Sequence, residues 1–425
     1  MKRNSFVPCL SIFCFFCFSL TFFAAIPALA EDMIRIGTLY PMTGPLALLG
    51  NEEWRGAEVA RVAQNEKGGV LGKKIEFVKA DAPDAKAATA EAERLITVEK
   101  VKVIVGSYSS SIAYASTAVA EKYKVVCFEM GGIADALTQR GFNYLFRISP
   151  LASEFGIMDV ELCEKKICPV LKLKPQDTKV AVIYEDTLYG TTVGTSAVKT
   201  AKARGFRVVA EEPYNAKAVD LSSLVMKLKS VNPDILMATS YANDAILFWR
   251  QAKELKLNVK AFIGNGGGHG LKDSADALGD DINYILNVDI TQPRNVNEKF
   301  CPGVKEFARR YEKLFGHPPR SGHSLRAYMG VNVLWDVIKR AKSMDPEAIR
   351  KAAMETDIPE GTTPTGWGVK FAPPGHLNQG TDLRAKPVVM QWFNQEQYTV
   401  YPQAAAVREM VVPLPTWEER AKGKK

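Results

Sequence analysis

A run of serines directly after an apolar segment is the feature of this chain most suited to binding chemistry. Residues 101–106 are apolar except for Lys102 and end in Gly106, and Tyr108, Ser110 and Ser111 lie in the serine-rich stretch that follows. Helical spacing of apolar residues then begins, so the serines open a helix. The first-turn N–H groups of a helix carry positive potential and have no intrahelical partner, so hydroxyls added there form a neutral cradle for a carboxylate. Serine is also a preferred helix N-cap, and the two roles are compatible.

Four other polar or glycine-rich segments also follow predicted strands. They cover residues 129–133, 184–190, 240–244 and 264–270. In the first of them, Glu129 precedes the adjacent glycines at 131 and 132, which let a ligand approach the backbone. Taken alone, the other three are typical of ordinary connections. The last lacks the G-x-G-x-x-G spacing because His269 holds the final position, so it does not predict a dinucleotide site.

Catalytic and metal-binding motifs are missing from the sequence. It contains no G-x-S-x-G, and its S-x-x-K match at residues 196–199 lies inside a helical pattern without partner motifs. The four histidines form no H-E-x-x-H, and the C-x-x-C at residues 14–17 lies in an N-terminal segment that we expect to be removed. We therefore expect a protein that is not an enzyme and needs no cofactor or metal.

Strands and helices must alternate to position these segments. Apolar β-branched runs at 34–39, 75–81, 101–106 and 124–130 are separated by helical patterns, and the alternation restarts after Pro150 with runs at 179–186, 206–214, 234–241 and 259–264. Such alternation predicts βαβ units with parallel sheets, in two blocks. Helical patterns then cover 297–315 and 322–342, and one more strand is expected at 387–393. In open parallel sheets, ligands bind at the carboxyl ends of the strands, where the polar segments lie.

The N-terminus has the pattern of a secretory signal peptide. Lys2 and Arg3 precede an apolar run over residues 6–23, and the small residues of Ala28-Leu29-Ala30 follow Pro27. We predict cleavage after Ala30; the alternative is an uncleaved membrane anchor. Three of the seven cysteines lie in this segment. Of the other four, Cys163 and Cys168 could form a disulfide in an exported protein or remain buried thiols.

Composition excludes several classes of protein. The 425 residues are 47% hydrophobic and 24% charged, which is typical of a globular chain of two or three domains and not of a disordered, collagen-like or coiled-coil one. A formal net charge of +8 is mild for this length, and export argues against a nucleic-acid partner. The charged C-terminal end, from Trp417 onward, is expected to be frayed.

Several short segments, in order, are similar to a known family. They include Ile36-Gly37, the Pro-Met-Thr-Gly-Pro of residues 41–45, the Gly-Gly-Val of 68–70, Gly106 with its serines, and Tyr189-Gly190. The Val-Lys-Phe of residues 369–371 and the stretch 389–402 match the ending. Together they span about residues 34–402 and resemble periplasmic solute-binding proteins of the leucine/isoleucine/valine-binding type, which deliver ligands to ABC transporters.

The resemblance implies an α/β fold of two Rossmann-like lobes with parallel central sheets, joined by a three-crossover hinge, with the ligand cleft between them. Lobe 1 would comprise residues 31–149 plus 291–385, lobe 2 residues 150–290 plus 386–402, and residues 403–425 a tail. It also implies a periplasmic location, a membrane permease as partner, a small-molecule ligand, and, we expect, a monomer. An exported enzyme or a ligand-sensing subunit of the same fold are the alternative functions.

The resemblance also implies a set of ligand-binding residues. Ser110, with Ser111 beside it, would hold a ligand carboxylate, and Gly131 would offer its backbone. Tyr189 and Tyr241 would approach from lobe 2 as the cleft closes.

Three positions differ from the amino-acid-binding pattern of that family. Ile133 replaces a threonine that would help to hold an ammonium, Gly266 replaces its carboxylate partner, and Leu49 replaces an aromatic ring. An ammonium taken out of water without a counter-charge is costly. We therefore expect an apolar or aromatic carboxylate. A branched-chain amino acid or an amide stays open, because Glu129 or Asp186 could supply the charge.

Overall fold

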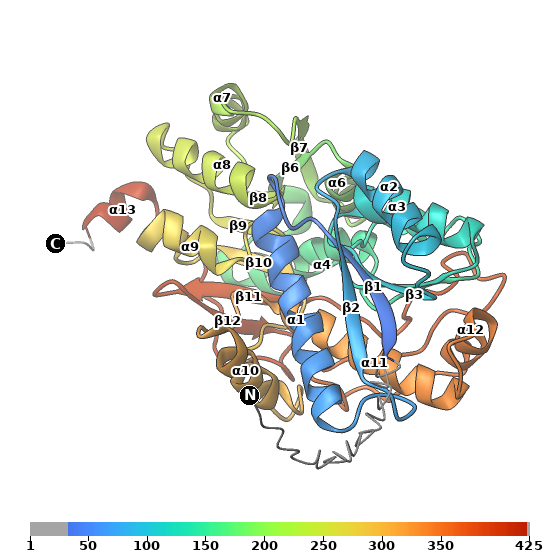
Figure 1. The fold of residues 1–425 in the computed structure, drawn as a ribbon. Helices are drawn as coiled ribbons and strands as arrows, with labels where there is room; N and C mark the ends of the chain where they lie inside the picture. The colour runs from blue at the N-terminus through green and yellow to red at the C-terminus, as the bar shows by residue number, and fades with distance from the viewer. Residues whose placement is uncertain (1–32, 423–425) are drawn as a thin grey trace, which may run out of the picture. The chain divides into compact units, whose positions relative to one another are not determined.

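The first sheet consists of five parallel strands in the order β2-β1-β3-β4-β5 (Figure 1). The computed structural model describes residues 33–422, so the predicted signal peptide lies outside the described residues. The strands are β1 (Ile34–Tyr40), β2 (Ile75–Asp81), β3 (Val103–Gly106), β4 (Val126–Glu129) and β5 (Leu145–Arg147). Most residues of β1 and all residues of β3, β4 and β5 are buried, as expected for parallel strands covered on both faces.

The second sheet has seven strands in the order β12-β11-β10-β9-β8-β6-β7. Its parallel part consists of β6 (Lys179–Glu185), β7 (Arg207–Tyr214), β8 (Ile235–Thr239), β9 (Ala261–Asn265) and β10 (Leu286–Asp289). Strand β11 (Val388–Phe393) pairs antiparallel with β10, and β12 (Glu396–Tyr401) pairs antiparallel with β11. The α/β class with two lobes is confirmed, and the second sheet carries these antiparallel strands at one edge.

Helices flank both sheets. Figure 1 shows α2 and α3 beside the first sheet and α7 and α8 beside the second. The helices are α1 (Ala47–Glu66), α2 (Ala85–Thr97), α3 (Ser110–Lys122), α4 (Ala152–Leu162), α5 (Cys168–Leu171), α6 (Leu188–Ala203), α7 (Ser222–Val231), α8 (Ala242–Glu254), α9 (Lys272–Leu278), α10 (Val304–Phe315), α11 (Gly322–Ala341), α12 (Pro346–Met354) and α13 (Trp417–Lys422). Their starts follow local chemistry: Asp84 caps α2 through the backbone N–H of Ala87 at 2.8 Å.

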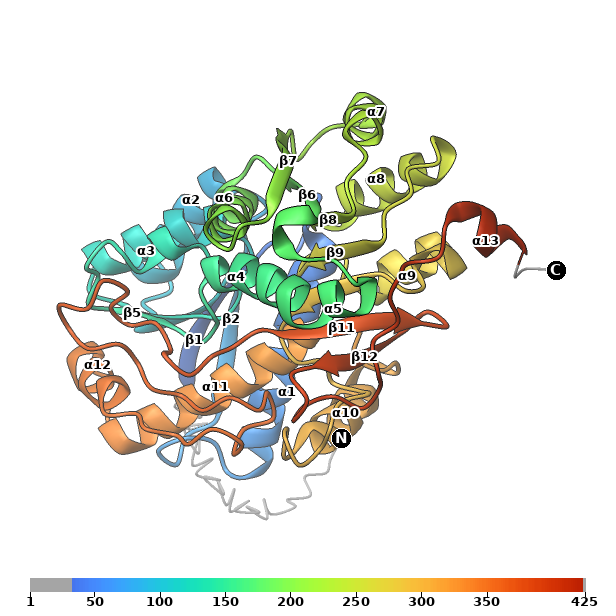
Figure 2. The same ribbon diagram turned by 180° about the vertical axis from the view of Figure 1, so that it is seen from behind.

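The chain passes between the two sheets more than once. After β10 it returns to the first sheet, where α11 packs against α1 and β4, and α12 packs against β4. It then goes back to the second sheet as β11 and β12, which Figure 2 shows at the edge of that sheet. Residues far apart in the sequence, on α11 and on the strand ends, are therefore brought close together. The lobe bounds given above stay a prediction.

Two further features of residues 33–422 are the state of the cysteines and the character of the helices. Cys127, Cys163, Cys168 and Cys301 are all free and buried, so the disulfide alternative is not realised in this structure. Between residues 33 and 422, no helix is long and apolar enough to cross a membrane.

The expectation of a frayed C-terminal end is wrong for α13. The indole of Trp417 is buried, packs 5.1 Å from the ring centroid of Trp249 and donates a hydrogen bond to the carbonyl oxygen of Leu257 at 2.9 Å. Burial of this large aromatic side chain outweighs the charges around it.

Candidate functional site

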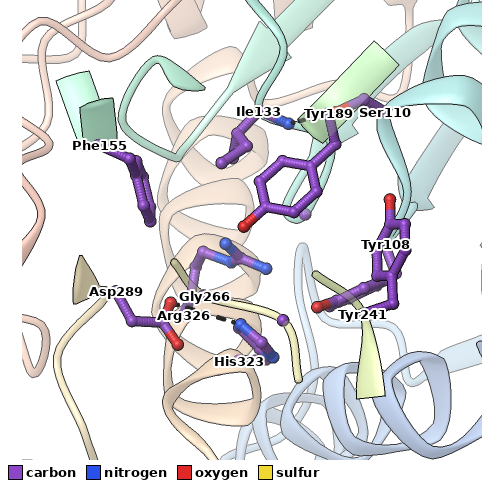
Figure 3. Close-up of a pocket in the computed structure, with 12 residues that line it drawn as sticks. Tyr108, Ser110, Ile133, Phe155, Tyr189, Tyr241, Gly266, Asp289, His323 and Arg326 are labelled. Carbon is purple, nitrogen blue, oxygen red and sulfur yellow. Dashed lines mark hydrogen bonds and ion pairs between the residues drawn. The ribbon is translucent and has the colours of Figure 1, made fainter. Parts of the chain in front are cut away.

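Residues from both sheets surround one cavity (Figure 3). The space free of atoms in and around it, open solvent included, is about 320 Å³. The residues that line it are Tyr108, Ser110, Gly131, Ile133, Phe155, Tyr189, Tyr241, Gly266, Gly267, Asp289, His323 and Arg326. Most of them follow the carboxyl ends of strands, because parallel strands end at the same edge of a sheet.

Ser110 connects the loops after β3 and β4. It is the first residue of α3, and its Oγ accepts hydrogen bonds from the backbone N–H groups of Ile133 at 3.2 Å and Ala134 at 3.1 Å. A serine hydroxyl that accepts in this way still has its own hydrogen to donate. Ser110 therefore can donate to an anion at the N-terminal end of α3.

Three tyrosines form an aromatic wall. The ring centroid of Tyr241 lies 6.3 Å from that of Tyr108 and 5.5 Å from that of Tyr189. The hydroxyl of Tyr189 donates to the carbonyl oxygen of Asn265 at 2.9 Å, and that of Tyr241 lies 3.5 Å from Ser109 Oγ. Burial raises the pKa of all three tyrosines, so they stay neutral and present flat, apolar faces with polar tips.

The charged residues of the cavity are ones that the sequence analysis did not select. Asp289 ends β10, and His323 and Arg326 lie in the first turns of α11. His323 Nε2 is 3.5 Å from Asp289 Oδ1, and Arg326 binds Glu53 Oε1 through Nε at 3.1 Å and Nη2 at 2.8 Å. Their spacing of three residues puts His323 and Arg326 on one helix face. This spacing was the feature of the sequence that could have identified them as a pair.

The Arg326–Glu53 pair lies within the protein interior. Both side chains are almost completely buried. Burial raises the pKa of the Glu53 carboxyl to about 8, against the opposing pull of Arg326. The guanidinium of Arg326 is thus held by the carboxyl group of Glu53 at the edge of the cavity.

The structure brings most of the predicted site residues together but leaves three outside the lining. Tyr108, Ser110, Gly131, Ile133, Tyr189, Tyr241 and Gly266 line the cavity; Ser111, Leu49 and Glu129 do not. Leu49 is buried in the hydrophobic core, and Ser111 is half-buried on α3.

Glu129 is bound by backbone groups and does not line the cavity. Its carboxylate accepts from the N–H groups of Ser107 at 2.7 Å, Gly131 at 2.9 Å and Gly132 at 2.6 Å. Asp186, the other acid considered for an ammonium, is exposed and accepts from the N–H of Ala216. The carboxylate that does line the cavity is that of Asp289, whose Oδ1 would be 3.5 Å from a Cβ atom added at Gly266.

Across residues 33–422, no group of three or more His, Cys, Asp or Glu side chains is arranged to hold a metal ion.

The amino-acid sequence is similar to those of known proteins. The model of a family described as periplasmic binding protein matches residues 33–383. The Leu/Ile/Val-binding protein homolog 7 of Brucella suis is 44% identical over 390 residues, which cover 92% of this chain and 96% of the relative.

Solved structures share the fold. The branched-chain amino acid transporter substrate binding protein LivJ from Streptococcus pneumoniae, in complex with isoleucine, has a TM-score of 0.73 and 24% identity over 90% of this chain and 100% of that one. A solute binding protein of an ABC transporter from Rhodopseudomonas palustris, in complex with p-hydroxybenzoic acid, has a TM-score of 0.74 and 20% identity over 93% of this chain and 100% of that one.

Proposed function

Because the chain belongs to the periplasmic binding protein family, we propose that it is the solute receptor of an ABC importer and binds a small carboxylate-bearing ligand in the cavity described above. The signal peptide predicted over residues 1–30 would export it to the periplasm. A membrane permease would be its partner and would receive the ligand.

The observation that carries the carboxylate proposal is the position of Ser110. Its hydroxyl lies in the cavity at the N-terminal end of α3, where the first backbone bond of the helix runs from the N–H of Ala113 to the carbonyl oxygen of Ser109. The N–H groups of the three residues before Ala113 have no acceptor within the helix. Hydroxyl, unpaired amides and helix dipole together favour an anion.

Closure of the two lobes would complete the site. Contacts already join the sides of the cavity: Tyr108, after β3, packs against Tyr241, after β8, and His323 of α11 lies beside Asp289 of β10. Ligand contacts made on both sides at once would favour the closed state, which is the state that we expect the permease to recognise.

The ligand's remaining part would lie against the aromatic wall. A Cβ atom at Gly266 would be 3.0 Å from Tyr189 Oη, and the φ of Gly266 is +40°, so this position has no room for an acidic side chain. The relatives point to two ligand groups, since one printed name refers to Leu/Ile/Val and one structure holds p-hydroxybenzoic acid. We propose a branched-chain amino acid-like ligand or an apolar or aromatic carboxylate.

A binding panel tests this function. The exported form would be unfolded and refolded to remove bound solute, then tested by thermal shift with branched-chain amino acids, their 2-oxo acids, aromatic carboxylates and short amides. A ligand at 100 times its Kd adds about 2.7 kcal/mol of stability and raises Tm by a few degrees. The result that would overturn the proposal is no shift with any carboxylate.

Ser110→Ala tests the carboxylate position. We expect calorimetric affinity for the carboxylate found in the panel to fall by about tenfold or more, because a charge-assisted hydrogen bond is lost. Ser116→Ala is the matched control: Ser116 is a buried serine of the same helix whose hydroxyl donates to the carbonyl oxygen of Ile112 at 3.0 Å. Equal affinities of the two variants would move the carboxylate elsewhere.

A further inference from the structure

We infer that the ligand carries a hydroxyl at the end opposite its carboxylate, and that Asp289 and His323 bind this hydroxyl. The inference rests on the proposed function, because it takes the carboxylate to lie at Ser110. Figure 3 places Ser110 and Ile133 on one side of the cavity and Asp289 and His323 on the other, with Tyr189 between them.

Asp289 has few hydrogen-bond donors for a buried carboxylate. It is 1% exposed, and its one short bond within residues 33–422 is from the N–H of Ile290 to Oδ1 at 2.7 Å. Asn287 Nδ2 and His323 Nε2 are each 3.5 Å from its oxygens. Most N–H···O bonds lie at about 2.7–3.2 Å, and a carboxylate offers about four acceptor positions. A donor brought by the ligand would therefore meet an unfilled acceptor in a dry site.

Two glycines make room for the carboxylate of Asp289, because a side chain at either position would approach it closely. A Cβ atom at Gly270 would be 2.5 Å from Asp289 Oδ2 and 2.7 Å from Asn287 Nδ2. One at Gly266, on the other side, would be 3.5 Å from Asp289 Oδ1. The carboxylate thus fits between two glycines of the loop after β9 and borders the cavity from there.

His323 provides the second half of the contact. It is 2% exposed, its ring lies edge-on to Tyr108 at 5.1 Å between centroids, and its Nδ1 has no hydrogen-bond partner among residues 33–422. A neutral imidazole has one donor and one acceptor nitrogen. A hydroxyl can donate to Asp289 and accept from His323 at the same time, whereas an ammonium can only donate.

The position of the pair favours a ligand whose two polar ends are far apart over an α-amino acid. In an α-amino acid the ammonium and the carboxylate are attached to the same carbon, whereas Ser110 and Asp289 lie on opposite sides of the cavity in Figure 3. The ring of Tyr189, which lies between the two sides in Figure 3, and those of Tyr108 and Tyr241 beside it fit a flat spacer. The class that combines these features is a hydroxylated aromatic carboxylate.

Matched ligands test the inference by calorimetry. Benzoate and 4-hydroxybenzoate differ only in the hydroxyl, and a site built to bind a hydroxyl rejects the analogue without it, here by about tenfold or more. In Asp289→Asn we expect this preference to fall to about threefold or less, because the charge-assisted bond is lost. Asp382→Asn, a buried aspartate outside the cavity lining, is the control and should keep the preference.

Each other outcome has a defined meaning. Equal binding of benzoate and 4-hydroxybenzoate by the native protein overturns this inference and leaves the proposed function intact. Tighter binding of leucine, lost in Asp289→Asn, also overturns it, because the donor would then be an α-ammonium. Binding of no carboxylate at all is instead a failure of the proposed function. If Asp289→Asn does not fold, His323→Gln replaces it, and an unchanged preference in that variant overturns the inference.

Discussion

The ends of β4 and β10 differ although both finish in a buried acidic residue. Glu129 at the end of β4 accepts three backbone N–H groups, those of Ser107, Gly131 and Gly132. Asp289 at the end of β10 accepts one short backbone bond, from Ile290, and borders the cavity. The comparison teaches that the number of backbone N–H groups within reach decides what an acid at the carboxyl end of a strand does. With several such groups, its carboxylate is bound by the backbone; with one, it keeps acceptor positions that a ligand could fill.

Side-chain length accounts for much of the difference. Glu185 ends β6 and behaves like Glu129: it accepts from the N–H groups of Thr187 and Gly190, each at 2.7 Å. The additional methylene lets a glutamate fold back onto the loop that follows its strand. Aspartate is shorter, and at the end of β10 it reaches only the amide of the next residue.

The largest expected effect is on stability, in Glu129→Gln. The amide NH₂ of glutamine would face backbone N–H donors, so buried groups would be left without partners. We expect the free energy of unfolding to fall by about 3 kcal/mol or more, measured by urea denaturation. Glu93→Gln, at an exposed position, should change it by less than about 0.5 kcal/mol. Equal losses in the two variants would contradict a structural role for Glu129.

Asp244, which follows β8, is expected to affect stability less than Glu129 and more than Asp289. Asp244 accepts a hydrogen bond from the hydroxyl of Tyr214 at 2.6 Å, and burial raises its pKa to about 7. The unfolded chain ionises this group near pH 4, so between about pH 4 and pH 7 the folded state binds more protons and stability falls as pH rises.

Asp244→Asn should remove that part of the pH dependence. Between pH 5 and pH 7 we expect the native protein to lose about 2 kcal/mol more than the variant does. Urea denaturation at pH 5, 6 and 7 measures this, and only the difference between the two proteins is assigned to Asp244. Parallel curves would mean that Asp244 stays ionised in the folded state, as a carboxylate with more donors would.

The smallest expected effect is that of Asp289→Asn on the ligand-free protein. The amide oxygen keeps the bond from Ile290, and few other donors lose a partner. We expect the free energy of unfolding to change by no more than about 1 kcal/mol. A loss as large as that of Glu129→Gln would show that Asp289 stabilises the fold as Glu129 does, and would contradict the difference between the two strand ends.

The sequence by itself determined the fold class and most of the cavity. Alternating β-branched and helical segments require parallel sheets, and strands that run parallel end at one edge. Loops after strands therefore meet, which brings Ser110, Gly131, Tyr189 and Tyr241 together at one cavity. Strands β5, β10 and β12 were not predicted, because β5 and β10 are only three and four residues long and the pattern at residues 396–401 is partly polar.

Only the tertiary structure decided which charges face the cavity. His323 and Arg326 lie more than 200 residues after Ser110, and their direction depends on how α11 packs against α1 and β4. The sequence analysis selected Glu129 and not Asp289, although both are acids at strand ends. The separation comes from side-chain reach, from the amides of the following loop and from contacts across the fold, and a sequence pattern encodes only the first of these directly.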